Sequence, residues 1–245
     1  MLALLVLAAQ AASPVTMVDV VVDPATVQVY IPAVGRSGLR ALQITDGTAR
    51  WHRPEATTPL TVAPGILIAQ ASGPAGTLTV LSLDAATGDI RQRCDGPVPD
   101  WLVTTPGRSH SHVFAIQAVM LDADTVDVFW AGRTWWGEGE DPGEAILAAS
   151  RHSDSGAFRC DLTTGRTRRL RANPPLALEV PAAVTLGSMT LRLGTGPILA
   201  PPPDRSLGVV VSSPEQRRTL QAVADGAVVW DVLLPSREPH GDPPP

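Results

Sequence analysis

The chain has 245 residues, of which 44% are hydrophobic, so it is long enough for one sizeable core or two small ones. Its 19 basic residues, all arginine, and 24 acidic residues give a net charge of -5. This balance excludes the basic surface of a protein that wraps nucleic acid or coats anionic lipid. Two cysteines, Cys94 and Cys160, are too few for a zinc-finger cluster or a disulfide framework. They form either one bridge in an oxidising compartment or two buried thiols.

Residues 1–13 begin with an apolar run and continue with small residues, among which Ala9 and Ala11 have the A-x-A spacing of a signal-peptidase site. We therefore expect a signal peptide and a periplasmic or secreted protein of the cell envelope. No positive charge precedes the run, so a start slightly downstream of the true one and an ordinary buried segment are the alternatives. No stretch reaches the roughly 18 to 20 uninterrupted apolar residues of a membrane helix, so no transmembrane segment is expected.

Residues 18–235 consist mainly of short apolar or alternating runs, separated by clusters of Gly, Pro and Asp. The runs are VDVVV, TVQVYI, LRALQI, GILIAQA, LTVLSL, TVDVFW, AVTL, MTLRL, LGVVV, LQAV and AVVW. Short strands at such close spacing predict an all-β sandwich, barrel or propeller. Residues 141–156 have Asp before Pro, Glu in the first turn and a glycine at the end, which predicts one short helix in an insertion. Residues 236–245 are a Pro-rich tail.

Four segments of the chain share one pattern, in which an apolar strand runs into Asp or Thr, then Gly, then a second strand. The segments are ALQITDGTARW (41–51), SLDAATGDIRQ (82–92), RCDLTTGRTRR (159–169) and LQAVADGAVVW (220–230). Each predicts a hairpin, because Asp or Thr can bond its own backbone and Gly accepts the positive φ of a tight turn. A unit of about 40 residues with about four strands cannot bury both faces alone. The repeats therefore predict four-stranded blades of a β-propeller, either small, incomplete or completed by a partner.

These segments resemble the β-propellers of the pyrroloquinoline quinone dehydrogenase type, whose blades carry a tryptophan-docking motif, A-x-D-x-x-T-G-x-x-x-W. Ala41, Gly47 and Trp51 match it in the first copy, with Gln43 and Asp46 in place of its Asp and Thr. The matching residues of the other copies are Asp84, Thr87 and Gly88, then Asp161, Thr164 and Gly165, then Gly226 and Trp230. Gln92 and Arg169 stand where the second and third tryptophans would be, and Asp225 stands in the Thr position of the fourth copy.

The resemblance implies that the matching residues are structural and that each tryptophan packs against the next blade. Catalytic members of the family add a quinone stacked on tryptophan, a disulfide of adjacent cysteines, and calcium held by Glu, Asn and Asp. This chain has no adjacent cysteines, and its acidic residues match no calcium triad. The resemblance therefore implies a non-catalytic binding or scaffold module without cofactor or metal, which binds protein or carbohydrate. The alternatives are a quinone-dependent oxidoreductase of alcohols or sugars, and a fragment of a larger propeller that needs a partner.

Residues 129–144, FWAGRTWWGEGEDPGE, combine aromatic side chains, glycine and negative charge in a predicted connection. Such a loop is able to bind a sugar, a cation or a cationic partner. The residues that would do so are Trp130, Trp135, Trp136, Glu138 and Glu140. The alternative is that the aromatic residues pack between blades and the acidic turn is solvated.

Two further segments carry residue types that serve in binding sites. His110 and His112 lie two apart, on one face of a strand, but no third metal ligand is visible, so paired surface histidines are the favoured interpretation. The arginines of residues 165–171 are expected to protect an edge strand against unwanted pairing.

Overall fold

The computed structural model describes residues 15–17, 19–33, 38–102, 104, 107–108, 112–134, 152–171, 183–186, 188–195 and 218–235. These residues form an all-β structure of four antiparallel sheets, and none of them is helical. The predicted helix at 141–156 is wrong at its C-terminal end, because residues 152–156 belong to a strand that pairs along its whole length. Residues 141–151, the signal-peptide segment 1–13, the LGVVV run at 207–211 and the tail 236–245 lie outside the described residues.

Each sheet is a meander in which sequential strands pair. Sheet 1 contains β1 (Val15–Met17), β2 (Val20–Asp23), β3 (Gln28–Pro32), β4 (Leu39–Gln43) and β5 (Ala49–Arg53). Sheet 2 contains β6 (Ala56–Ala63), β7 (Ile66–Ala71), β8 (Thr77–Asp84) and β9 (Ile90–Pro97). Sheet 3 contains β10 (Gly107–Arg108), β11 (His112–Met120), β12 (Thr125–Thr134), β13 (His152–Asp161) and β14 (Thr167–Leu170). Sheet 4 contains β15 (Ala183–Leu186), β16 (Met189–Thr195), β17 (Arg218–Ala224) and β18 (Ala227–Leu234).

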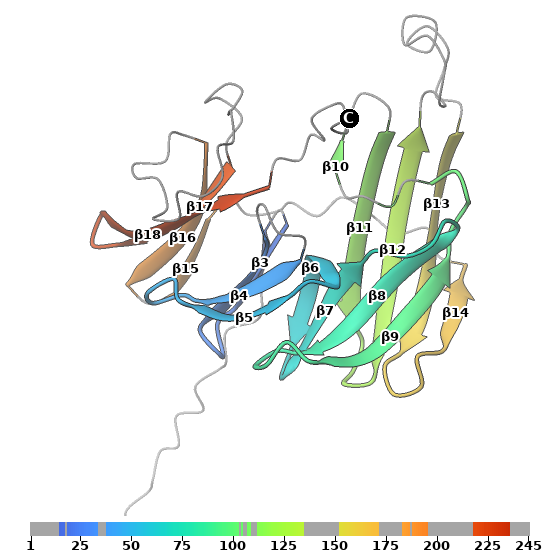
Figure 1. The fold of residues 1–245 in the computed structure, drawn as a ribbon, viewed down its shortest axis with the longest axis horizontal. Helices are drawn as coiled ribbons and strands as arrows, with labels where there is room; N and C mark the ends of the chain where they lie inside the picture. The colour runs from blue at the N-terminus through green and yellow to red at the C-terminus, as the bar shows by residue number, and fades with distance from the viewer. Residues whose placement is uncertain are drawn as a thin grey trace, which may run out of the picture.

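The sheets pack face to face in the spatial order 4, 1, 2, 3, which differs from their order along the chain (Figure 1). Each of three hydrophobic clusters fills the space between two neighbouring sheets. One cluster joins sheets 4 and 1 through residues such as Val22 and Leu220, the next joins sheets 1 and 2, and the third joins sheets 2 and 3. The last sheet of the chain therefore packs on the first, and sheets 3 and 4 lie at opposite ends of the series.

Burial explains why the central strands read as apolar runs rather than as alternating ones. In β8, six consecutive residues are buried, because sheet 2 has sheet 1 on one face and sheet 3 on the other. Edge strands differ: β9 alternates between exposed and buried residues over most of its length, and β14 has no fully buried residue. The arginines of residues 165–171 lie on and beside β14, an edge strand of sheet 3, as predicted.

The glycine turns predicted from the repeats are present at the ends of four hairpins, and all four glycines have positive φ. Three of the turns have the same backbone hydrogen bonds, in which the glycine N–H donates to the carbonyl four residues earlier: Gly47 to Gln43, Gly88 to Asp84 and Gly165 to Asp161. The fourth differs, since Ala224 pairs directly with Ala227 around a two-residue turn. Asp225 and Gly226 have φ of 51° and 79°, the combination that a two-residue hairpin of this kind requires.

Candidate functional site

The clearest constellation of repeated residues is found where the edge strand of one sheet meets the glycine turn of the next. Trp51 of β5 donates from Nε1 to the Ala85 carbonyl at 3.0 Å. A Cβ added to Gly88 would lie 2.6 Å from the Trp51 ring, so only glycine leaves room for it. Arg53 adds a hydrogen bond from Nε to the Gly88 carbonyl at 2.7 Å and an ion pair with Asp89 at 2.9 Å. Packing of the Trp51 ring, the hydrogen bond of its indole N–H and the polar contacts of Arg53 thus hold sheet 1 on sheet 2.

Trp230 makes the equivalent contact between sheets 4 and 1. Its Nε1 donates to the Ile44 carbonyl at 2.7 Å, and a Cβ on Gly47 would lie 2.9 Å from its ring. Because 186 residues separate Trp230 from Ile44, this contact fixes the end of the described chain to its beginning.

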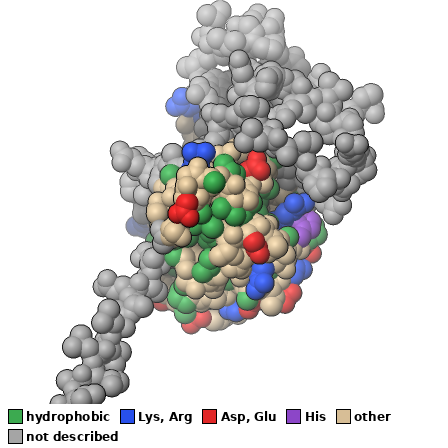
Figure 2. Space-filling view, turned by 90° about the vertical axis from the view of Figure 1, so that its left-hand side faces the viewer, with side chains coloured by type: hydrophobic (Ala, Val, Ile, Leu, Met, Phe, Trp, Pro, Cys, Tyr) green, Lys and Arg blue, Asp and Glu red, His purple; other side chains and the backbone are tan. Residues whose placement is uncertain are grey.

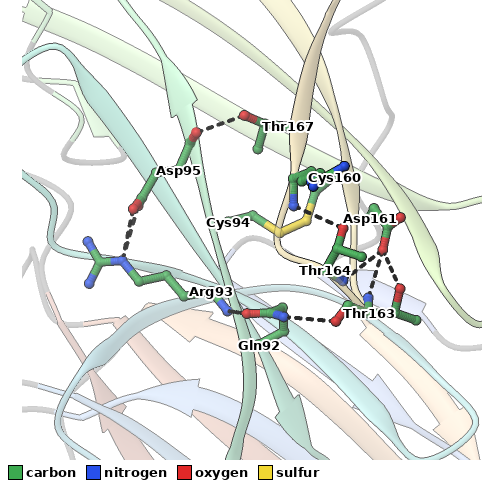
Figure 3. The surroundings of a disulfide bond; sticks show 10 residues. Gln92, Arg93, Cys94, Asp95, Cys160, Asp161, Thr163, Thr164 and Thr167 are labelled. Atoms are coloured by element: carbon green, nitrogen blue, oxygen red, sulfur yellow. Dashed lines mark hydrogen bonds and ion pairs between the residues drawn. A yellow bond between two sulfur atoms is a disulfide. The ribbon is translucent and has the colours of Figure 1, made fainter.

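The contact between sheets 2 and 3 uses other chemistry at the same place (Figure 3). Gln92 donates from Nε2 to the Thr163 carbonyl at 3.1 Å, beside the Gly165 turn. Two residues further along β9, Cys94 forms a disulfide with Cys160, and the two Cα atoms are 6.1 Å apart. This separation lies in the range that bridged cysteines adopt. The open question about the two cysteines is therefore answered by a covalent bond between two sheets.

The turn carboxylates are held by short local hydrogen bonds. Asp161 accepts hydrogen bonds from the Thr163 hydroxyl at 2.6 Å and from the N–H groups of Thr163 and Thr164 at 2.9 Å. These donors lower the pKa of Asp161 to about 2, because they stabilise its charged form. The pKa of Asp84 is lowered in the same direction, first by the side chain of Arg91 and then by the N–H of Thr87. The aspartates that resemble the family motif thus stabilise their own turns.

Arg169 does not occupy the position that the sequence alignment assigns to it. In sheets 1, 2 and 4 a β-bulge lies between the glycine turn and the docking residue, at Ala41/Leu42, Ser82/Leu83 and Ala222/Val223. No bulge interrupts the pairing of β13 with β14, so Arg169 lies opposite Phe158 and faces sheet 2. Arg168 lies opposite Arg159, on the other face of sheet 3. The alignment is wrong here because one residue of register reverses the face of every side chain.

The predicted ligand loop is corrected for its first residue. Trp130 is not in a loop: it lies in β12, is 3% exposed, and covers Gly156, where a Cβ would be 2.8 Å from its ring. Trp135, Trp136, Glu138 and Glu140 lie outside the described residues. The packing alternative therefore describes Trp130.

For the histidine pair, His112 lies in β11 opposite Thr134, its side chain is not described, and His110 lies outside the described residues. No group of three potential metal ligands occurs within the described part of the chain.

The bidentate ion pair between Arg159 and Asp127 was not predicted from the sequence. Arg159 donates from Nε and Nη2 to both carboxylate oxygens of Asp127 at 2.7 and 2.9 Å, on the face of sheet 3 that points away from sheet 2. The hydrogen bonds to Asp127 raise the pKa of Arg159 further. Strand alternation could have predicted this pair. Asp127 and Arg159 each lie between two apolar residues, whose side chains point to the opposite face of the sheet.

The described residues do not fit the quinone and calcium centre of the catalytic β-propellers that the sequence motif resembles. The two cysteines are 66 residues apart and bonded to each other between sheets, and the indole N–H groups of Trp51 and Trp230 are used in packing contacts.

Among the described residues, no helix is long and apolar enough to cross a membrane. A scan of the chain against protein-family models finds no match, and neither does a search of the curated proteins.

Proposed function

We propose that the chain is a non-catalytic β-propeller-type scaffold or binding module that is exported and acts at the cell envelope. The observation that carries the proposal is the repeated contact at three successive interfaces, where an edge strand reaches the glycine turn of the next sheet. In a propeller each blade contacts only its neighbours in this way, and its stability comes from such contacts. The four sheets are then four blades, and residues 18–235 are the repeat domain.

The disulfide supports the export part of the proposal. Cys94 and Cys160 are 1% and 0% exposed and belong to the cluster between sheets 2 and 3. Structural disulfides of this kind persist in oxidising compartments and are rare where thiols are kept reduced. A protein with this bridge is therefore suited to the periplasm or the extracellular space, in agreement with the signal peptide expected at 1–13.

The use of the repeated residues supports a scaffold rather than an oxidoreductase. Trp51, Trp230 and Gln92 each donate a side-chain N–H to a backbone carbonyl of the adjoining sheet, so each is committed to packing. A rigid series of sheets presents its connecting loops as a recognition surface for protein or carbohydrate.

Two measurements test the proposal. The full chain, produced in a bacterial host, is expected in the periplasm with residues 1–13 removed and with no free thiol by maleimide labelling after denaturation. A chain retained in the cytoplasm with both thiols free would contradict export.

Purified protein is then incubated with pyrroloquinoline quinone and calcium, and absorbance and dye-linked oxidation of alcohols and sugars are measured. We expect neither bound quinone nor oxidation. Stoichiometric quinone with turnover would refute the scaffold proposal and favour the oxidoreductase.

A further inference from the structure

Among the described residues, the docking contacts leave unused one of the four repeat glycine turns and one of the four strands that end the sheets. The turns of Gly47, Gly88 and Gly165 each receive a side chain from the neighbouring sheet, whereas no described atom lies within 4 Å of a Cβ added to Gly226. Likewise β5, β9 and β18 each reach a turn on the following sheet, whereas β14 has no such contact among the described residues. The unused turn belongs to sheet 4 and the unused strand to sheet 3.

Register identifies the residue of β14 that takes the docking position. Trp51 lies opposite Ala41 and Gln92 opposite Ser82, and each partner is two residues before the first residue of its turn, Gln43 or Asp84. In sheet 3 the turn begins at Asp161, so the equivalent partner is Arg159 and the docking residue is Arg168. The exposed Arg168 therefore lies on the face of sheet 3 that is turned away from sheet 2. This is the same register position from which Trp51 of sheet 1 contacts sheet 2.

The residue at the docking position of sheet 3 and the first residue of the unused turn of sheet 4 are opposite in charge. Arg168 would meet the turn of Asp225 and Gly226, whose residues are both exposed. Behind these residues lie the two outer faces, which are free among the described residues. The free face of sheet 3, turned away from sheet 2, carries Val119, Asp127 and Arg159. The free face of sheet 4, turned away from sheet 1, carries Arg192, Gln221, Val228 and Asp231. Val119 and Val228 are each 39% exposed, so each of the two free faces offers an apolar side chain for contact. Figure 2 looks onto the sheet 4 end, where apolar side chains gather among a few acidic and basic ones.

These surfaces do not meet within one chain, because sheets 3 and 4 lie at opposite ends of the series (Figure 1). We propose that they pair between two copies of this chain, with Arg168 of each copy docked on the Asp225–Gly226 turn of the other. Two twofold-related contacts then join two sets of four sheets into one ring of eight, within the range of known propellers. The inference rests on the propeller-type packing of the proposed function and adds its partner.

The composition of the faces sets the character of the pairing. Apolar clusters fill the three interfaces inside the chain, whereas the two free faces mix charged, polar and apolar side chains, as reversible interfaces do. The dimer is therefore reversible, and it weakens as salt screens the contact of Arg168 with Asp225.

Analytical ultracentrifugation of the full chain at low and high salt tests the pairing. We expect a monomer–dimer equilibrium, and charge reversal by Arg168→Glu or by Asp225→Arg raises its dissociation constant about tenfold or more. Arg50→Glu, a reversal on the exposed edge strand of sheet 1, is the matched control and leaves the equilibrium unchanged. Asp225→Asn, which keeps a residue suited to positive φ, weakens the dimer without straining the turn.

Mixing the two charge-reversed variants, Arg168→Glu and Asp225→Arg, gives the sharpest result. In a mixed dimer both substitutions fall at the same contact, where the two charges have exchanged places and still attract each other. The second contact joins the unchanged Arg168 of one copy to the unchanged Asp225 of the other. The mixture is therefore expected to dimerise more tightly than either variant alone.

A wild-type monomer at about 100 μM, a series of larger species, or a mixture that stays monomeric would overturn the two-copy ring; an affinity near the micromolar scale is ordinary for such interfaces. A monomer that keeps its disulfide and binds no quinone leaves the scaffold proposal standing, so the two proposals fail separately.

Discussion

The interface between sheets 1 and 2 and the interface between sheets 2 and 3 perform the same mechanical task with different chemistry. At the first, Trp51 covers Gly88 and bonds to Ala85, and Arg53 pairs with Asp89. At the second, Gln92 stands in the tryptophan position and donates one hydrogen bond to sheet 3, and the Cys94–Cys160 disulfide lies two residues away. A covalent bond thus stands where a large buried ring is missing. A repeat position can therefore carry a different residue where a neighbouring position provides the attachment between the sheets.

The largest effect is expected from removing the disulfide. The double variant Cys94→Ala/Cys160→Ala, or reduction of the wild type, should lower the free energy of unfolding by about 4 kcal/mol, because the bridge closes a long loop in the unfolded chain. Urea unfolding measures the change, and hydrogen exchange should show lower protection in the most protected strands, because the bridge acts on global unfolding. Equal unfolding midpoints with and without reductant would contradict the role of the bridge.

Removing the tryptophan at the interface between sheets 1 and 2 should lower the free energy of unfolding somewhat less than removing the disulfide does. Trp51→Ala is expected to destabilise the protein by about 3 kcal/mol, since it deletes a large, partly buried ring. Trp51→Phe keeps most of the ring but loses the hydrogen bond to Ala85, so about 1 kcal/mol is expected. Chemical denaturation separates the two contributions. If alanine and phenylalanine had the same small effect, ring packing would not hold sheet 1 on sheet 2.

A matched pair of glycine substitutions isolates the docking contact from backbone strain. Gly88→Ala and Gly226→Ala both place a side chain at positive φ, near 75° and 79°. Only the first also meets a ring, because the space around Gly226 is open. We expect a loss of about 1 kcal/mol for Gly226→Ala and about 1 to 3 kcal/mol more for Gly88→Ala. Thermal and urea unfolding of both variants side by side provide the comparison, and equal losses would count against a close contact at Gly88.

The smallest effect is expected from the turn carboxylate beside the disulfide. The pKa of Asp161 is about 2 in the folded protein and about 3.9 in an unfolded chain. Because the folded value is the lower one, the charged group contributes stability above about pH 4, and this contribution is lost as the pH falls toward about 2. Asp161→Asn should therefore show a weaker pH dependence of the urea midpoint between about pH 5 and about pH 2 than the wild type. Identical pH profiles would show that the turn does not hold the charge.

Most local structure could be predicted because it depends on residues close in the chain. The glycines of the four repeats have the positive φ expected of them, and the apolar runs within the described residues are strands. The predicted helix at 141–156 is wrong for residues 152–156, which begin β13, because their pairing with β12 outweighs their weak helix preference. Trp130 looked like a loop residue because its burial depends on Gly156, which lies opposite it on β13.

The strands and the turns could be predicted from the sequence alone, since alternation, positive φ and the Asp-capped turns are properties of short segments. The contacts between sheets became known from the tertiary structure. It paired Cys94 with Cys160, placed Trp230 on the turn at the beginning of the chain, and turned Arg168 rather than Arg169 to the free face. These contacts depend on how whole sheets stack and on a single residue of register, and no local preference encodes either.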